Sequence, residues 1–245
     1  MTANELWNTW DCRIPLTGKW EGLVTDKIFG LDAGDVMEFM GWFISEGWSV
    51  KCKNTGTKTT LGIGQSRESN PVKSKRIEEL FNRLGFSWNY VPSSMAYYVG
   101  IRSMPTELVK MCHSLGTAKD KFIPTELFKY STALLGRLHE SMILGDGCTT
   151  NNTNNNRKDR RNYFTVSKRL ADDFQTLTLL IGLRGKITIR KSNNKQKNDL
   201  YCVGVNIKPY AAVDDAKRLA QSAPGRHRDS YRQCRVFSRT QCSVT

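Results

Sequence analysis

The spacing of apolar residues along the first half of the chain predicts alternating helices and strands. Apolar positions that recur every three or four residues indicate helices with one buried face, whereas short runs rich in β-branched and aromatic residues are typical of strands. The predicted helices are 35–47, 70–85 and 105–116, and the predicted strands are 48–54, 58–65, 86–91 and 95–102. Asn70 is the expected N-cap of the second helix, Pro71 its first residue and Gly85 its end.

The second half repeats this order. Its predicted helices are 132–147, 167–182 and a stretch near 210–220, and its predicted strands include 162–166, 186–190 and 200–208. Both halves therefore read helix–strand–strand–helix–strand–strand–helix. An Asn-rich stretch at 151–156 predicts a long loop between the first two strands of the second half.

Charge is distributed unevenly along the chain. The formal net charge is +14, and residues 157–245 hold 20 of the 37 Lys and Arg residues but only 7 of the 23 Asp and Glu residues. A polyanion is the natural partner of such a surface, through counterion release and electrostatic steering. A basic tail that only aids solubility would give the same composition, so charge alone favours nucleic acid modestly.

Composition excludes several other classes of protein. No run approaches eighteen apolar residues, so we expect no membrane span. The N-terminal stretch lacks the basic and then apolar layout of a secretion signal, which favours a cytoplasmic location. Seven cysteines without C-x-x-C spacing and only three histidines favour free thiols over a disulfide framework or a zinc site.

Two of the predicted helices end in an acid followed by glycine. Glu46 and Asp146 close them, and each has small residues on one face, at 41 and 45 in the first helix and at 141 and 145 in the second. Residues four apart share a helix face, and small side chains let two helix backbones approach closely. We therefore expect the two helices to pack together and to bring both acids to one shared end.

Two acids at that end need a chemical reason. The C-terminus of a helix carries partial negative charge, and two carboxylates about 4 Å apart repel by about 4 kcal/mol at an effective dielectric near 20. One such dipeptide is an ordinary helix end, but a matched pair in a matched repeat indicates a site for a divalent cation. Hard oxygen ligands suit Mg²⁺.

The same residues resemble a known family. "FMGWFISEG" (39–47) and "HESMILGDG" (139–147) resemble the two copies of the LAGLIDADG motif of homing endonucleases. The stretches at 62–86, 120–128 and 164–183 look like the intein-associated, or DOD-type, branch of that family. The resemblance extends over roughly 35–210.

The resemblance implies an α+β fold. Two pseudo-twofold related αββαββα halves are expected, whose saddle-shaped antiparallel sheets lie in the DNA major groove, with the two motif helices packed at the centre. On this basis we divide the chain into an irregular lead-in (1–31), a first half (32–124), a second half (125–220) and a basic, disordered tail (221–245). The family also implies a monomer that cuts both strands of a long double-stranded DNA site with Mg²⁺ or Mn²⁺.

The resemblance also assigns roles to single residues. Glu46 and Asp146 are the implied metal ligands and catalytic acids, and the carbonyls of Ser45 and Gly145 are possible further ligands. Gln65 matches a glutamine that positions water, with Lys168 as its looser counterpart in the second half. Lys208 matches a lysine that stabilises developing charge on the phosphate.

Some positions depart from the family pattern. His139 and Glu140 stand where apolar or small residues are usual. The first-half position that matches Lys208 is Met104, so Arg102 or Lys121 would have to substitute for the missing lysine. These differences predict unequal rates for the two cuts.

Candidate DNA contacts lie on the outward faces of the predicted strands. Arg and Lys suit guanine edges and phosphates alike, so sequence does not separate positioning from specifying contacts. The candidates are Lys51, Lys53, Lys58 and Thr60 in the first half, and Lys186, Thr188, Arg190 and Asn206 in the second.

Three functions remain open on sequence alone. A site-specific DNA endonuclease is favoured, because binding alone does not need two repelling carboxylates. An RNA-binding maturase and a non-catalytic DNA-binding regulator on the same fold are the alternatives. Protein splicing is not expected, since the sequence begins Met-Thr and ends "TQCSVT", so a free-standing nuclease or an intein remnant fits best.

Overall fold

The computed structural model describes residues 13–15, 20–51, 58–150, 160–192, 198–206 and 210–212. The first half runs α2 (Ala33–Glu46), β4 (Gly47–Lys51), β5 (Lys58–Gly64), α3 (Pro71–Arg83), β6 (Trp88–Val91), β7 (Ala96–Gly100) and α4 (Thr106–Ser114). The second half runs α5 (Thr132–Asp146), β8 (Gly147–Thr150), β9 (Arg160–Thr165), α6 (Lys168–Leu180), β10 (Arg184–Arg190) and β11 (Leu200–Asn206). Short 3-10 turns stand at Pro92–Ser94 (η1), Ile101–Ser103 (η2) and Thr125–Lys129 (η3).

Each half builds one four-stranded antiparallel sheet. The strand orders are β4-β5-β7-β6 and β10-β11-β9-β8, so the strand that follows each motif helix pairs with the next strand of its half. The registers match as well, because Gly47 pairs with Ile63 in the first half and Gly147 with Tyr163 in the second. The α+β fold of two related halves is thus confirmed, including the pairing of the two strands that flank the Asn-rich loop, β8 and β9.

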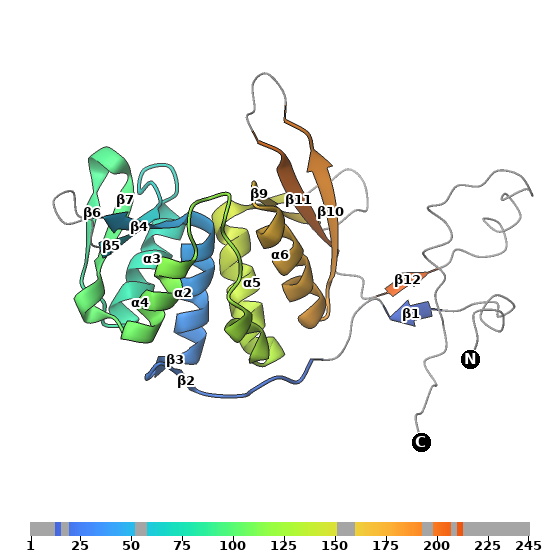
Figure 1. Cartoon of the computed structure of the whole chain (residues 1–245), viewed down its shortest axis with the longest axis horizontal. Helices are drawn as coiled ribbons and strands as arrows, with labels where there is room; N and C mark the ends of the chain where they lie inside the picture. The colour runs from blue at the N-terminus through green and yellow to red at the C-terminus, as the bar shows by residue number, and fades with distance from the viewer. Residues whose placement is uncertain are drawn as a thin grey trace, which may run out of the picture.

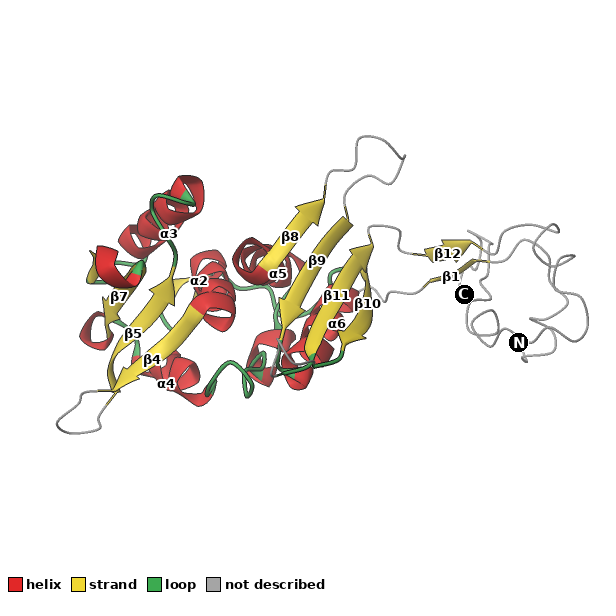
Figure 2. Cartoon of the chain, turned by 90° about the horizontal axis from the view of Figure 1, so that it is seen from above, coloured by secondary structure: helices red, strands yellow, loops and turns green. Residues whose placement is uncertain are grey.

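The two motif helices lie side by side at the centre of the molecule (Figure 1). Seen from above, the two sheets lie next to one another on one side of the helices (Figure 2). In the first sheet, Leu61, Ile63 and Val99 point toward the helices and are fully buried. The opposite face of each sheet is left open, which is the arrangement expected of a saddle.

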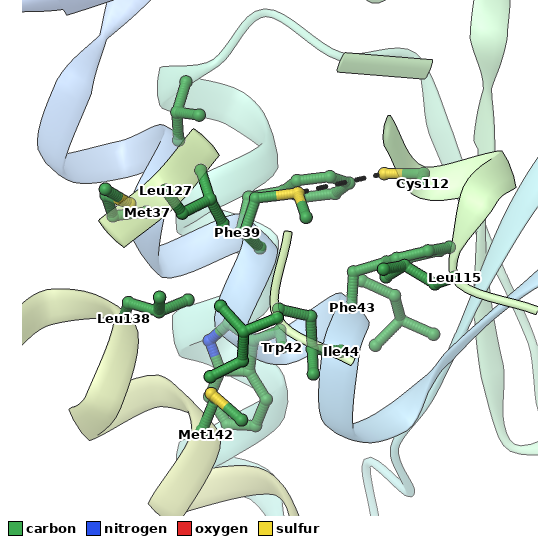
Figure 3. Close-up of a cluster of buried hydrophobic side chains, with 14 of the residues drawn as sticks. Met37, Phe39, Trp42, Phe43, Ile44, Cys112, Leu115, Leu127, Leu138 and Met142 are labelled. Carbon is green, nitrogen blue, oxygen red and sulfur yellow. Dashed lines mark hydrogen bonds between the residues drawn. The ribbon is translucent and has the colours of Figure 1, made fainter. Parts of the chain in front are cut away.

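The central part of the hydrophobic core forms where α2 meets α4, α5 and the segment before α5. Phe39, Trp42 and Phe43 of α2 pack among residues from those elements, including Leu115, Leu127 and Met142 (Figure 3). All of these side chains are buried. Most positions of α2 are apolar, because the helix is surrounded on all sides from Val36 to Ser45, and only its first turn and its last residue are partly exposed.

Helix ends follow the predicted residues with one difference in detail. Gly85 has φ of +68° and Gly182 has φ of +79°, so both follow their helices in the left-handed conformation that glycine tolerates best. Asn70 occupies the N-cap position of α3, but its side chain makes no capping hydrogen bond there. Pro71 alone supplies the preorganised start of that helix.

Residues 20–32, just before α2, contact the segment that leads into α5. Trp20 Nε1 donates to the Tyr130 carbonyl at 2.8 Å, and Leu23 forms a backbone bridge with Tyr130. The two-residue strands β2 (Lys27–Ile28) and β3 (Leu31–Asp32) then pair just before α2. This segment therefore attaches the start of the first half to the start of α5.

The expected helix near 210–220 is wrong at its beginning. Residues Tyr210–Ala212 form strand β12, which pairs with β1 (Arg13–Pro15). The remainder of that stretch and the expected tail at 221–245 lie outside the described residues. Within the part of the chain that is described, no helix has the length and apolar character needed to cross a membrane.

Candidate active site at the ends of the paired helices

Helices α2 and α5 approach closely through the predicted small residues. A Cβ added to Gly41 would clash with the Ser141 side chain and lie 2.7 Å from the Leu138 carbonyl oxygen. A Cβ added to Gly145 would lie 2.5 Å from Ser45 Cβ. Neither position has room for a side chain, so the small residues set the distance between the two helices.

This packing brings the two acids to one place. Glu46 is the last residue of α2 and Asp146 is the last residue of α5. Glu46 Cγ lies 3.4 Å from the point that a Cβ on Gly145 would occupy, so the Glu46 side chain passes directly over the end of α5. Both acids are partly buried, and a strand leaves immediately after each of them.

Of the two acids, Asp146 has the more strongly raised pKa. Burial and then the nearby Glu46 carboxylate raise the pKa of Asp146 to about 7, against the opposing effect of Lys121 and Lys73. Burial also raises the pKa of Glu46, and the same two lysines again oppose the change. A charged carboxylate with a raised pKa at a helix C-terminus is unfavourable for stability unless a cation lies nearby.

Lys121 is the basic residue of this site. Its Nζ donates to the Ser45 carbonyl at 2.8 Å and to the Phe43 carbonyl at 3.4 Å. Burial lowers the pKa of Lys121 to about 8, although Asp146 and Glu46 favour the charged form. The ammonium group therefore compensates the C-terminal carbonyls of α2 and faces both acids.

The second half of the molecule holds the Lys121 backbone in place. Ser167 Oγ, at the N-cap of α6, donates to the Lys121 carbonyl at 2.7 Å. Asp173 Oδ2, on the same helix, accepts a hydrogen bond from the Ile123 backbone N–H at 2.9 Å. Lys121 is thus anchored by the second half while its ammonium group reaches the motif helix of the first half.

Among the two substitutes considered for the missing lysine, the structure places Lys121 and not Arg102 at the acids. Met104 is buried at 7% exposure and Arg102 is exposed at η2, beyond the end of β7. Lys208 and Lys53 lie outside the described residues. The local sequence does not mark Lys121 as a buried residue, because Lys119 and Asp120 directly precede it and a lysine among charged residues is normally exposed.

Gln65 lies directly after β5 and is buried. Its neighbour Gly64 would place a Cβ 4.0 Å from a Glu46 carboxylate oxygen, so the end of β5 lies beside the first acid. Counting from the matched pairs Gly47–Ile63 and Gly147–Tyr163, the second-half counterpart of Gln65 is Thr165. The sequence comparison missed Thr165, because the long loop before β9 hides the register.

Lys168 lies three residues beyond that counterpart. Its side chain is exposed and pairs with Asp172 at 2.6 Å across one helical turn. Thr165, in contrast, is buried, and its Oγ1 accepts the backbone N–H of Ser167 at 3.1 Å. A role for Lys168 at the acids stays a prediction that depends on the family resemblance.

Two unusual residues of the second motif have structural partners. His139 is buried and stacks on Phe174 with ring centroids 4.8 Å apart, and burial followed by Arg161 lowers its pKa to about 4. Glu140 accepts a hydrogen bond from Arg76 Nη1 at 3.1 Å. Both residues lie about two helical turns before Asp146, the acid at the end of α5.

The available ligands fit a metal that is shared with a substrate. In the described part of the chain, no group of three or more His, Cys, Asp or Glu side chains is arranged for a metal ion. Mg²⁺, however, is commonly bound by one or two carboxylates together with substrate phosphates. The Ser45 carbonyl already accepts from Lys121, whereas Glu46 and Asp146 are the two acids that converge.

The candidate DNA contacts divide between described and undescribed side chains. Lys186, Thr188, Arg190 and Asn206 are exposed on β10 and β11, and Thr60 is half-buried on β5. The backbones of Lys51 and Lys58 pair at the far end of the first hairpin, but their side chains lie outside the described set. The exposed second-half residues share the open face of their sheet, since Lys186 pairs with Gly204 and Thr188 with Cys202.

One family model matches the second half of the chain, from the middle of α5 onward. Residues 140–220 match the LAGLIDADG-like domain family. The match includes Asp146 and the strands and helix that follow it. No curated protein matches the chain.

Solved structures that the chain is similar to include homing endonucleases and a LAGLIDADG domain. The chain is similar to I-DmoI in complex with DNA and Mn, with 12% identity over 71% of this chain and 90% of that chain and a TM-score of 0.47. I-WcaI bound to its DNA recognition sequence is 11% identical over 71% of this chain and 76% of that chain, with a TM-score of 0.46. The N-terminal LAGLIDADG domain of DUF199/WhiA is 11% identical over 76% and 80% of the two chains, with a TM-score of 0.45.

Proposed function

We propose that the chain is a site-specific endonuclease that hydrolyses both strands of double-stranded DNA with a divalent metal. One observation carries the proposal: the last residues of α2 and α5, Glu46 and Asp146, converge at one end of the helix pair. Burial, and then the nearby Glu46 carboxylate, raise the pKa of Asp146 to about 7, so the charged form of this acid is unfavourable here without a cation. A cation together with a phosphate is the chemistry that makes such a pair useful.

Each residue of the site has a proposed role. Glu46 and Asp146 hold Mg²⁺ or Mn²⁺, which when bound supplies Lewis-acid activation of water and of the phosphate. Lys121 presents a buried ammonium group beside the acids and stabilises negative charge on the phosphate. Gln65 orients the attacking water on the first-half side.

The open faces of the two sheets are the proposed DNA-binding surface. Lys186, Thr188, Arg190 and Asn206 are exposed on one sheet, and the chain carries a net charge of +14. Basic side chains near phosphates provide affinity that falls with salt, and base-edge contacts provide specificity. We further propose a monomer with a long target site, encoded as a free-standing nuclease or an intein remnant.

The test is cleavage of a randomised double-stranded DNA library with Mg²⁺ and, separately, with Ca²⁺, followed by sequencing of the ends. We expect enrichment of one long site in Mg²⁺. Glu46→Gln and Asp146→Asn should then abolish cutting of one or both strands of that site while DNA affinity measured in Ca²⁺ is kept.

Two results would contradict this function. If the protein retains DNA with strong salt dependence but cuts nothing, it is a DNA-binding regulator. If it binds structured RNA more tightly than the library at the same salt concentration, the maturase alternative is correct. In either case the two acid variants should behave like the wild-type protein.

A further inference from the structure

An aromatic pair lies on the open face of the first sheet, beside Glu46. Trp48 is the second residue of β4, two positions after Glu46, and its side chain is 38% exposed. It pairs across the sheet with Gly62, which in turn pairs with Tyr98. The Trp48 and Tyr98 rings meet edge to face, with centroids 6.2 Å apart.

The sheet is built to hold the Trp48 ring against its surface. A Cβ on Gly62 would lie 2.6 Å from Trp48 Cζ2, and a Cβ on Gly64 would lie 3.5 Å from Trp48 Cζ3. The ring therefore covers a floor of glycine backbone. Tyr98 is fixed as well, because its hydroxyl donates to Ser94 Oγ at 3.3 Å. Two fixed rings present apolar surface at little cost in side-chain entropy.

The second sheet differs at the same register positions. Cys148 pairs with Asn162, and Asn162 pairs with Gly204, where the first sheet has Trp48, Gly62 and Tyr98. Asn162 Nδ2 donates weakly to Cys148 Sγ at 3.9 Å. Next to the cut, the two halves thus offer different chemistry, with an apolar aromatic surface on one side and an amide and thiol on the other.

We propose that Trp48, supported by Tyr98, selects a thymine in the base pair next to the cut on the first-half side. The inference rests on the proposed function and deepens it. The C5 methyl of thymine is the apolar group that base pairs display in the major groove. Two strand residues span about 7 Å, or about two base-pair steps, so Trp48 reaches a base close to the phosphate at Glu46.

The experiment uses the DNA site obtained from the cleavage selection. Each thymine near the cut is replaced in turn by deoxyuridine, which removes only the methyl group, and affinity in Ca²⁺ and cleavage in Mg²⁺ are measured. We expect the wild-type protein to lose about fourfold in affinity at one first-half position, the value of one buried methyl group. Trp48→Ala should bind the thymine and deoxyuridine sites equally at that position, and Trp48→Phe should keep part of the difference.

Cys148→Ala is the matched control, because Cys148 occupies the same register position in the second half. This variant should show the same loss of affinity as the wild-type protein when a thymine of the first half-site is replaced by deoxyuridine. The inference is overturned if Trp48→Ala and Trp48→Phe, both folded by thermal melting, keep the wild-type penalty at every position. In that result cleavage persists and the proposed function stands, whereas a wild-type protein that cuts no site overturns both.

Discussion

Lys121 Nζ donates a 2.8 Å hydrogen bond to the Ser45 carbonyl, across a sequence distance of 76 residues. The bond joins a segment anchored on the second half to the acid-bearing end of the first motif helix. A buried ammonium group with a pKa near 8 remains mostly charged at neutral pH, and in the proposed reaction it would face the phosphate held at the two acids. Lys121 therefore has two roles: it joins the two halves of the molecule, and it is a candidate residue for the proposed chemistry.

Replacement of Lys121 by methionine should slow cleavage far more than it weakens DNA binding. Loss of one preorganised electrostatic donor costs about 10²–10³ in rate in comparable sites. Single-turnover cleavage and affinity in Ca²⁺ separate the two effects. Lys121→Arg should retain part of the activity, because it keeps the charge in a crowded position.

Lys75→Met is a suitable control for that variant. Lys75 lies on the exposed side of α3, where it pairs only loosely with Glu79 at 3.8 Å. Its removal changes the net charge equally but should leave the cleavage rate of bound DNA unchanged. Equal effects of the Lys121 and Lys75 variants would show that Lys121 acts through overall charge alone.

Cleavage should depend on pH through Asp146. The pKa of Asp146 is about 7 in the metal-free protein, so at pH 6 this carboxyl is mostly protonated and binds a cation poorly. The rate at limiting Mg²⁺ should rise between about pH 6 and pH 8, and higher Mg²⁺ should move the midpoint to lower pH by mass action. A midpoint that does not move with Mg²⁺ would argue against titration of a metal ligand.

The same carboxyl should reduce stability above neutral pH. Its folded pKa lies above the unfolded value of 3.8, so the folded state binds more protons between pH 4 and pH 7, and stability falls as the pH rises through that window. Asp146→Asn should therefore be more stable than the wild-type protein at pH 8, by about 1–2 kcal/mol. Urea unfolding without metal at pH 5 and pH 8 measures this, and the difference should shrink at pH 5.

Residue patterns predicted the central relationship because its causes are local. Each motif has two small residues four positions apart, which lie on one face of its helix. When these two faces pack together, Gly41 contacts Ser141 and Gly145 contacts Ser45. The acids follow one residue later. Periodicity also identified the strands, since Leu61, Ile63 and Val99 alternate with open-face residues.

The features that sequence did not predict depend on long-range register and on segments between elements. Lys121 reaches Ser45 because Ser167 and Asp173 hold its segment, and spacing gives no measure of that contact. Thr165 matches Gln65 only once the pairing of Gly147 with Tyr163 is known. Likewise, the stretch near 210 has helical spacing, yet Tyr210–Ala212 pairs with β1, because a partner strand decides the conformation of so short a stretch.

The close approach of the motif helices makes a further prediction about stability. Gly41→Ala should destabilise the protein by about 2–3 kcal/mol, because the new Cβ meets Ser141 and the Leu138 carbonyl in a packed interface. Gly136→Ala on α5 is the control, since a Cβ there meets nothing within 4 Å. It should stabilise the helix by about 0.5–1 kcal/mol. Equal changes in the two urea midpoints would contradict tight packing at Gly41.

The register equivalence of Gln65 and Thr165 predicts unequal cutting of the two strands. Gln65→Ala should slow cleavage of one strand by about 10²-fold, the low end for a positioned proton-transfer or water-orienting group. Thr165→Val should slow the other strand less, because Thr165 Oγ1 already accepts the Ser167 N–H and is less available to water. A duplex labelled separately on each strand shows both rates.

Lys168→Met tests which residue is the second-half counterpart of Gln65. Strand register points to Thr165, whereas the family resemblance points to Lys168. The Lys168 side chain is exposed and paired with Asp172, so the structure predicts at most a small, salt-sensitive change in binding. If Lys168→Met instead slows one strand strongly while Thr165→Val changes neither rate, the register argument is wrong. Lys168 would then have to leave Asp172 and turn toward the acids when DNA binds, which the loss of a single exposed ion pair would permit at low cost.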